Sequence, residues 1–275
     1  MRQEKKFKME SELYHYGVLG MRWGVRRYQN KDGTLTPEGK EHYAVEPGKT
    51  VKVNRDGSKT IPAGFQFNRI GKETMDVNKS GGLYVSYGKD DAARYVKNLG
   101  PTPFRKLIGL KATTVQHVKA KSALKMPSDQ EMAKELCGVL LSNGKVFDSF
   151  RDSFYSNVFT GDLEKQVTRA DIQRALANAG GRSGQKMAYC VASMFGDSQY
   201  KDETRAIYRR FRELGYDAVP DLLDRYGGTS KTAMIIINPE KVEITSTTEI
   251  TKDVMKSAKN YVKTIEKLPV SELIK

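Results

Sequence analysis

Apolar and polar residues alternate in several short runs of the chain, which is the pattern of β-strands with one buried face. Phe65, Phe67 and Ile70 are the apolar positions expected to face a core. Towards the C-terminus, the continuous apolar run of residues 233–237 indicates a buried strand. The expected strands are residues 50–53, 60–61, 65–70, 83–87, 106–118, 233–237 and 242–245.

Helical patterns fill the middle of the chain, where apolar residues recur every three or four positions. Ser128 with Glu131 forms a capping-box pattern, and Thr168 with Asp171 starts another helix. The expected helices are residues 90–98 (capped by Asp90 or Asp91), 128–144 (closed by Gly144), 168–180, 185–195, 202–214 and a terminal one from 251 onward.

The order of these elements is strands, then a block of helices, then strands again. A doubly wound parallel sheet would instead alternate strands and helices regularly. The order therefore predicts an α+β domain over residues 46–275, in which the first and last strands share one sheet. A small Gly/Arg-rich module over residues 1–45 precedes this domain.

The net charge of the chain is +14, from 47 Lys and Arg against 33 Asp and Glu. A chain this basic is attracted to polyanions such as DNA or RNA. The basic residues are dispersed, so the charge fits either a DNA-packed environment or an ordinary solvated surface. No apolar run is long enough to span a membrane, and residues 1–10 lack the apolar stretch of a signal peptide.

Cysteine and histidine are too sparse to suggest a metal centre. Cys137 and Cys190 each lie among apolar residues of an expected helix, where a buried structural thiol is the simplest interpretation. His15, His42 and His117 are scattered along the chain, so we expect no metal site.

The segment Tyr14–Tyr28 differs from the rest of the chain in composition. It contains three glycines and the single tryptophan, Trp23, next to arginines. Glycine at this density opposes a regular helix and favours a turn-rich shape. Because buried Trp, Tyr and Arg dominate binding interfaces, the segment is expected to bind a partner. Its expected partner-binding residues are Arg22, Trp23, Arg26, Arg27 and Tyr28.

This segment, His-Tyr-Gly-Val-Leu-Gly-Met-Arg-Trp-Gly-Val-Arg-Arg-Tyr, followed by residues 32–40, is similar to a module of phage and prophage head-associated proteins. The resemblance implies a phage-encoded protein made in the bacterial host cytoplasm and carried in the virion. It implies phage head or portal proteins as partners, with a host protein or packaged DNA as alternatives.

A second resemblance covers residues 60–250. Pro62–Ile70 followed by Leu83–Ser86 resembles the opening of the ADP-ribosyltransferase fold, and residues 215–221 with 235–242 resemble its closing strands. This implies split sheets with a helical insertion, and NAD as cofactor. In that family a first-strand arginine binds the NAD phosphates, and a serine-containing strand shapes the nicotinamide pocket. Arg69, Tyr84 and Ser86 are the positions that match.

In the same family a late glutamate stabilises the positive charge of the transition state. No Glu-x-Glu or Gln-x-Glu pair lies near the closing strands of this chain. Asp221 and Asp224, expected in a loop, occupy that region, and Glu240 is the substitute at a strand edge. A carboxylate misplaced by about 1 Å can lower the rate about a hundredfold, so the resemblance implies a divergent site.

Residues 180–184, Gly-Gly-Arg-Ser-Gly, resemble a phosphate-binding loop at a helix start. They lack the Gly-Lys-Ser/Thr ending of a nucleotide P-loop and follow a helix, so a helix–helix turn is the favoured interpretation.

Three functional hypotheses follow from the sequence. The first is a head-associated minor structural or packaged protein with a divergent ADP-ribosyltransferase-like domain. The second is an active NAD-dependent protein ADP-ribosyltransferase. The third is a non-catalytic module that binds a host defence protein, a nucleotide-derived signal or DNA.

Overall fold

The computed structural model describes residues 50–71, 81–102, 112–196 and 198–265. The chain divides into two units between Gly48 and Lys49, and all described residues belong to the second unit. The segment expected to bind a partner, including Arg22, Trp23 and Tyr28, lies outside the described residues. So do most of the residues expected to begin the strand at 106–118.

Nine strands form three antiparallel sheets in the described part of the chain, with strand orders β1-β2-β6, β3-β5-β9 and β4-β8-β7. The strands are β1 (Lys52–Val53), β2 (Lys59–Ile61), β3 (Gln66–Gly71), β4 (Leu83–Val85), β5 (Thr114–Ala120), β6 (Leu124–Met126), β7 (Ala218–Pro220), β8 (Met234–Ile236) and β9 (Val242–Glu249). An isolated bridge between Asn68 and Ser86 connects β3 to the end of β4.

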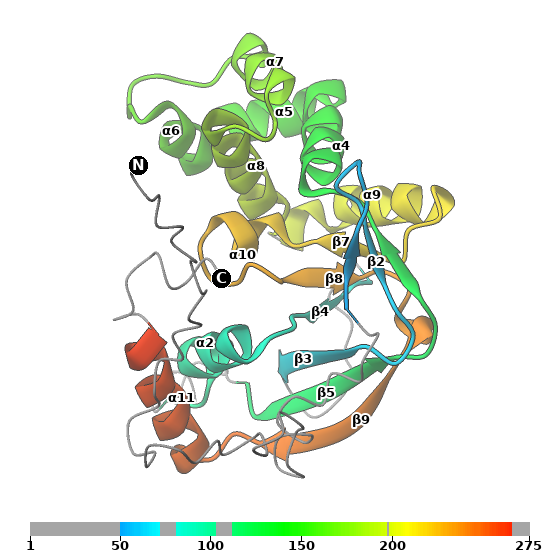
Figure 1. The fold of residues 1–275 in the computed structure, drawn as a ribbon. Coiled ribbons are helices and arrows are strands. Elements are labelled where there is room, and N and C mark those ends of the chain that lie inside the picture. The colour runs from blue at the N-terminus through cyan, green and yellow to red at the C-terminus, as the bar shows by residue number, and fades with distance from the viewer. Residues whose placement is uncertain (1–49, 72–80, 103–111, 197, 266–275) are drawn as a thin grey trace, which may run out of the picture. The chain divides into compact units, whose positions relative to one another are not determined.

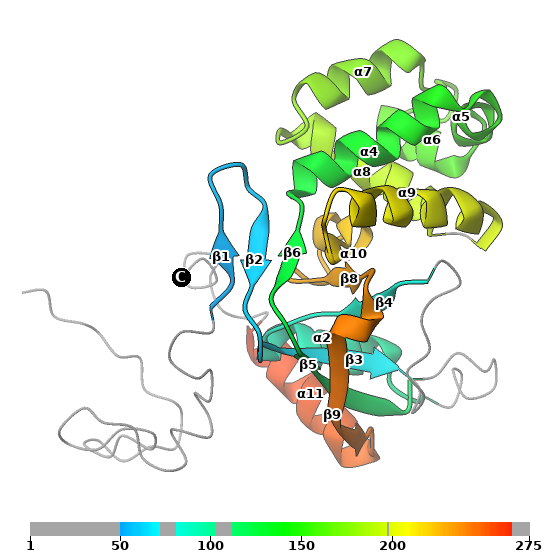
Figure 2. The ribbon, with the colours of Figure 1, turned by 90° about the vertical axis from the view of Figure 1, so that its right-hand side faces the viewer.

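The helices form a block inserted between β6 and β7, with further helices near both ends of the domain. They are α2 (Lys89–Leu99), α4 (Asp129–Ser142), α5 (Gly144–Arg151), α6 (Phe154–Thr160), α7 (Arg169–Ala177), α8 (Arg182–Phe195), α9 (Lys201–Glu213), α10 (Leu222–Tyr226), α11 (Lys252–Ile265) and the 3-10 turns η1 (Ser198–Tyr200) and η2 (Pro239–Lys241). Figures 1 and 2 both show the helical block on one side of β7 and β8, and α2 with α11 on the other side of the domain.

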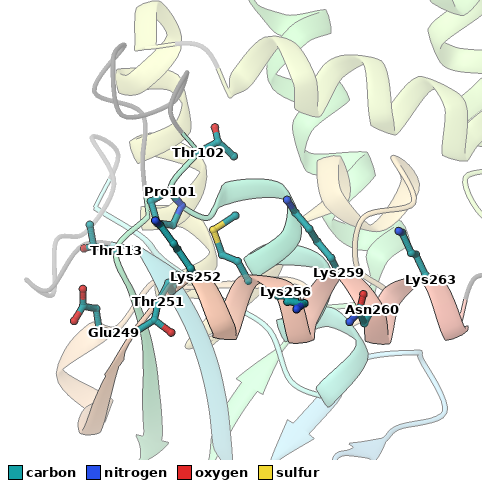
Figure 3. A pocket seen from close by; sticks show the side chains of 12 residues that line it. Pro101, Thr102, Thr113, Glu249, Thr251, Lys252, Lys256, Lys259, Asn260 and Lys263 are labelled. Atoms are coloured by element: carbon teal, nitrogen blue, oxygen red, sulfur yellow. The ribbon is translucent and has the colours of Figure 1, made fainter.

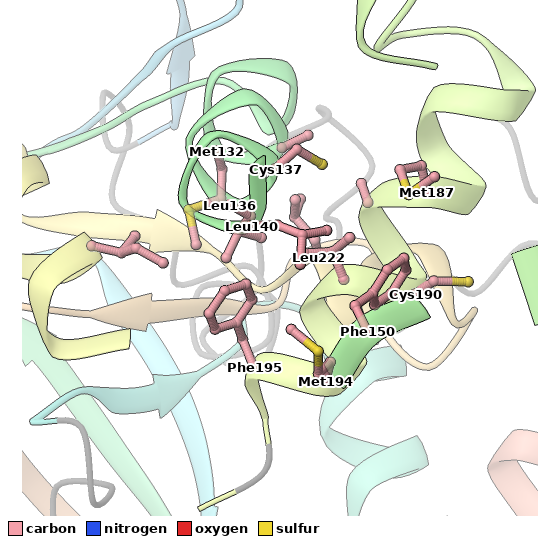
Figure 4. Close-up of a cluster of buried hydrophobic side chains, with 14 of the residues drawn as sticks. Met132, Leu136, Cys137, Leu140, Phe150, Met187, Cys190, Met194, Phe195 and Leu222 are labelled. Atoms are coloured by element: carbon pink, nitrogen blue, oxygen red, sulfur yellow. The ribbon is translucent and has the colours of Figure 1, made fainter. Parts of the chain in front are cut away.

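Three apolar cores hold these layers together. The largest packs the helical block against one face of β7 and β8 and includes Phe150, Cys190 and Phe195 (Figure 4). A second core lies between β3-β5-β9 and β4-β8-β7, around Phe67. The third packs α2 and α11 against β3 and β5, around Val96. The domain is therefore a stack of helices, sheet, sheet and helices.

Strand β8 explains why the run 233–237 is apolar without alternation. Met234 and Ile236 belong to the core between the sheets, whereas Ile235 and Ile237 belong to the helical core. All five residues of the run are buried. A strand covered on both faces has no polar side, so the prediction of a buried strand is confirmed.

The structure confirms the α+β class and the strand–helix–strand order, but it changes two features of the sheets. The first and last strands, β1 and β9, lie in different sheets, so the prediction of a shared sheet is wrong. Strand β9 pairs with β5, and β1 pairs with β2 instead. Strand β6, of three residues, was not expected from the sequence, whereas β7 lies within residues 215–221, which the family resemblance gave as part of the closing strands.

Two of the expected helix ends differ from prediction in how they are capped. Helix α2 begins at Lys89 after Gly88, without a side-chain cap from Asp90 or Asp91. Gly144 does not close a helix; α4 ends at Ser142, and the Asn143 side chain accepts a hydrogen bond from Val146 N–H to start α5.

Only one of the two expected capping patterns is a complete capping box. Thr168 and Asp171 each accept the other's backbone N–H at the start of α7. Ser128 accepts from Glu131 N–H, but the Glu131 carboxylate accepts from the Tyr216 hydroxyl at 3.1 Å.

Candidate functional site

Polar residues gather at one end of the β4-β8-β7 sheet. Val85 and Pro220 both pair with Met234, so β4 and β7 end where β8 begins. Asp221, directly after β7, donates its N–H to the Ala233 carbonyl at 3.2 Å. Ser86, directly after β4, lies on the other side of β8, so the two residues are roughly 10 Å apart at the usual strand spacing.

Arg69 lies beside this end through the bridge between the two sheets. Asn68 and Ser86 exchange both backbone hydrogen bonds, at 2.7 and 2.9 Å. The Arg69 guanidinium is buried and donates to the Gln116 Oε1 atom at 2.5 Å. Gly71 lets it lie there, because a Cβ at that position would come within 3.1 Å of Arg69 Nη1. The guanidinium is thus held in a fixed position between the sheets.

The Ser86 hydroxyl has no hydrogen-bond partner among the described residues, although the residue is only 1% exposed. Buried hydroxyl groups are nearly always hydrogen-bonded, because an unsatisfied one destabilises a fold by about 1–3 kcal/mol. Such a group marks a position where a ligand atom would restore a missing interaction.

Two carboxylates, those of Asp221 and Asp224, follow β7 at the start of α10. Asp221 is the N-cap of α10, and its side chain accepts from Asp224 N–H at 3.3 Å. The prediction of a loop here is wrong, because these residues start α10. Burial, followed by the charge of Asp224, raises the pKa of Asp221 to about 7. Asp224 in turn accepts a hydrogen bond from the Tyr95 hydroxyl of α2, and burial raises the Tyr95 pKa.

Asp91 forms a second buried polar group at the same end of the sheet. Its carboxylate accepts from the Ser230 hydroxyl at 2.5 Å and from Thr232 N–H at 3.2 Å. The Thr232 hydroxyl lies 2.6 Å from the same carboxylate and accepts from Tyr87 N–H at 2.9 Å. The interaction joins residues more than a hundred positions apart, so no local sequence pattern signals it.

Arg225 of α10 adds a buried cation that the sequence analysis missed. Its Nε donates to the Ala233 carbonyl at 2.6 Å, and its Nη1 forms an ion pair with Asp129. Its Nη2 atom is buried and has no hydrogen-bond partner in the described chain. Burial, followed by the charge of Arg225, lowers the pKa of Lys59.

A hollow of about 320 Å³ lies between α8 and α10. Three cations and two tyrosines surround it, and its lining residues are Arg182, Gln185, Lys186, Tyr189, Arg225 and Tyr226. Residues 178–181 connect α7 to α8 and residues 182–184 begin α8, so the run 180–184 spans the end of a helix–helix turn and the start of the second helix. Gly184 packs against that turn, since a Cβ there would meet the Asn178 carbonyl oxygen at 2.4 Å.

The remaining predicted site residues lie elsewhere. Glu240 is exposed in η2, at the opposite end of β8, and does not join Asp221 and Asp224. Tyr84, in β4 two residues before Ser86, is 46% exposed and faces away from the inter-sheet core. The structure thus brings Ser86, Asp221 and Asp224 to one end of a sheet, with Arg69 beside them.

Within the described residues, no cluster of three or more His, Cys, Asp or Glu side chains could hold a metal ion. Cys137 and Cys190 are buried free thiols, as expected, and burial raises the pKa of the Cys137 thiol to about 12. No helix in this part of the chain is long and apolar enough to cross a membrane.

The chain is thus an α+β domain in which Ser86 and Asp221 lie on either side of the start of β8, and Arg69 lies next to the bridge that joins β3 to Ser86. Comparison with known proteins adds one match at the other end of the chain. Residues 7–30 match the Family of unknown function (DUF7211). No curated protein matches the chain, and no solved structure matches it either.

Proposed function

We propose that this chain is a phage head-associated protein whose α+β domain binds NAD in an ADP-ribosyltransferase-like arrangement, with transfer of ADP-ribose weak or absent. The observation that carries the proposal is the convergence of Ser86, Asp221 and Asp224, with Arg69 beside them, at one end of a sheet. These residues come from distant parts of the chain, and each matches a position that the family resemblance assigns to the site.

The residues fit NAD in part. The unpartnered Ser86 hydroxyl can donate a hydrogen bond to a ligand oxygen, and bound NAD would supply the ribosyl group for transfer. Arg69 is committed to Gln116, so a phosphate would have to share its guanidinium. Arg182 and Lys186 offer further phosphate contacts at the hollow that Arg225 also lines.

The carboxylates argue for weak catalysis. A pKa of about 7 leaves Asp221 about half protonated at neutral pH, so it supplies only part of a negative charge. Asp224 is bound by Tyr95 and is one methylene shorter than a glutamate. Because a misplacement of about 1 Å can lower a rate about a hundredfold, we expect binding to exceed turnover.

Calorimetric titration of the full-length protein with NAD tests the binding. Wild-type protein should bind NAD, and Ser86→Ala should weaken binding about two- to tenfold, the usual effect of one hydrogen bond. Ser193→Ala is the matched control, because this buried α8 serine donates to the Tyr189 carbonyl of its own helix and lies away from the end of the sheet. If the wild-type protein shows no heat of NAD binding, the proposed NAD site is refuted.

A labelled-NAD assay on host lysate separates the binding protein from the enzyme. Transfer of label that is abolished by Asp224→Asn supports the active-enzyme alternative and identifies the carboxylate. Binding without transfer supports the divergent domain. Transfer that persists unchanged in Asp224→Asn and Asp221→Asn excludes both acids from catalysis.

Association with the virion rests on the resemblance of the Gly/Arg-rich module to phage head-associated proteins, and it has its own test. The family match over residues 7–30 falls on the Gly/Arg-rich module and leaves the α+β domain uncovered. Mass spectrometry of purified particles should detect peptides from both parts of the chain, and particles without any such peptide would exclude this location.

A further inference from the structure

Helix α11 carries a row of four lysines on one face. Lys252, Lys256, Lys259 and Lys263 are all exposed and follow one another at intervals of four, three and four residues. At about 100° per residue, this spacing keeps all four side chains within an arc of roughly 60°. Figure 3 shows the row along the helix.

The row lies apart from the face that anchors the helix. Met255, Ala258, Val262 and Ile265 are buried, and α11 packs against α2. The lysines instead border a groove of about 920 Å³, together with Pro101, Thr102, Thr113, Glu249, Ile250, Thr251, Met255 and Asn260. Glu249 is the single acidic residue among those that line it.

The lysines receive no compensation from the described part of the chain. None of the four forms an ion pair there. Like charges three or four residues apart destabilise a helix by a few tenths of a kcal/mol per pair. Lys252 also lies in the first turn, where the helix dipole disfavours a cation. Among the residues that line the groove, four lysines thus stand against one carboxylate, that of Glu249.

We propose that the groove along α11 binds the phosphate backbone of a nucleic acid. From Lys252 to Lys263 the helix rises roughly 16 Å, a length that covers about five phosphates of one strand along a duplex axis. The threonine hydroxyls and the Asn260 amide are neutral groups that also bind phosphate oxygens. None of the residues that line the groove is aromatic, so it lacks the stacking surfaces of a single-strand binding site. Contacts to phosphates alone carry no sequence information, so the binding is independent of base sequence. This inference goes beyond the proposed function and does not depend on it.

Salt dependence gives the sharpest test. Full-length protein is titrated into a labelled random-sequence duplex at several salt concentrations, with fluorescence anisotropy as the readout. Each phosphate contact contributes about 0.9 to the slope of log K against log salt. The double variant Lys256→Gln/Lys259→Gln should therefore lower the magnitude of the slope by about 1.8, and should weaken binding by tens of fold at about 0.1 M salt.

The matched control is Lys134→Gln/Lys145→Gln, which removes two exposed lysines from α4 and α5. It changes the net charge equally, so an equal loss of affinity would overturn the assignment to α11. An unchanged slope in the α11 variant would overturn it too. So would tighter binding to a poly-glutamate peptide than to the duplex, because that result assigns the groove to an acidic protein segment. Thermal unfolding of both variants should match the wild type.

Discussion

Two buried donors without acceptors, the Ser86 hydroxyl and Arg225 Nη2, are the most informative single atoms of the domain. Each lies next to the sheet end where β8 begins, Ser86 after β4 and Arg225 in α10. An unmade hydrogen bond destabilises the free protein, so each atom has a measurable consequence even without ligand.

Ser86→Ala should leave the free energy of unfolding unchanged or raise it by up to about 1 kcal/mol, because the substitution removes an unsatisfied hydroxyl. Ser156→Ala is the contrasting variant, since the buried Ser156 hydroxyl accepts from Val167 N–H at 2.8 Å. Its loss should lower stability by about 1–3 kcal/mol. Urea denaturation measures both, and equal destabilisation would mean that Ser86 has a partner after all.

Asp221→Asn tests the raised pKa of this carboxyl. Its pKa moves from 3.8 in the unfolded chain to about 7 in the folded one. The folded state therefore binds more protons between these values, and its stability falls as pH rises from about 4 to 7. Asparagine keeps the N-cap acceptor and removes the charge. The free energy of unfolding of the variant should rise by a few kcal/mol relative to that of the wild type as the pH increases from 4 to 8. If the stability of the two proteins changes with pH in parallel, the raised pKa of Asp221 is refuted.

Single residues were predictable from the sequence where the determinant is local. Thr168 and Asp171 start α7 as expected, because a capping box needs only four consecutive residues. Asp91 and Arg225 were missed as site residues, because their partners, Ser230 and Asp129, lie far away in the sequence. The positions of Ser86 and Asp221 on either side of β8 became visible only in the folded chain.

At the scale of elements, two helical glycines are expected to respond in opposite ways to an added Cβ atom. Gly138 lies inside α4 with open space around its Cβ position, whereas a Cβ on Gly184 in α8 would meet backbone atoms of Asn178 and Ala179. Gly138→Ala should stabilise the protein by about 1 kcal/mol through helix propensity.

Gly184→Ala should destabilise it by about 1–3 kcal/mol through overpacking, because backbone atoms cannot move aside. Thermal unfolding of the two variants provides the comparison. A gain in stability for both would show that the α7–α8 turn is looser than described.

Helices α8 and α9, of 14 and 13 residues, have strong periodicity and were predicted close to their observed bounds. Strand β8 was predicted because its run is apolar throughout. Helices α5 and α6 and strand β6 were not predicted, because three to eight residues carry too little periodicity to be distinguished from loops. Local sequence patterns also do not show which strands share a sheet. Strand β1, for example, pairs with β2 rather than with the last strand.

At the scale of the whole domain, β8 belongs to two cores at once. Loss of packing in either core therefore weakens the strand that both share. Phe150→Ala in the helical core and Phe67→Ala between the sheets should each lower stability by about 3–5 kcal/mol.

Both variants should shift one common unfolding transition. Circular dichroism and hydrogen exchange over residues 49–275 provide two independent probes of it. Separate transitions for helices and sheets would show that the two cores are independent.

The pairing of early strands with late ones also constrains how the domain is made. Strand β4 pairs with β8, and β5 with β9, across the whole helical block. During synthesis, residues 50–126 therefore leave the ribosome long before these partners exist. The helical block can begin to collapse on its own contacts, but the sheets close only after β9 has emerged. Chaperones that shield nascent strands should accordingly bind the region of β3 to β5, and their removal should lower the soluble yield.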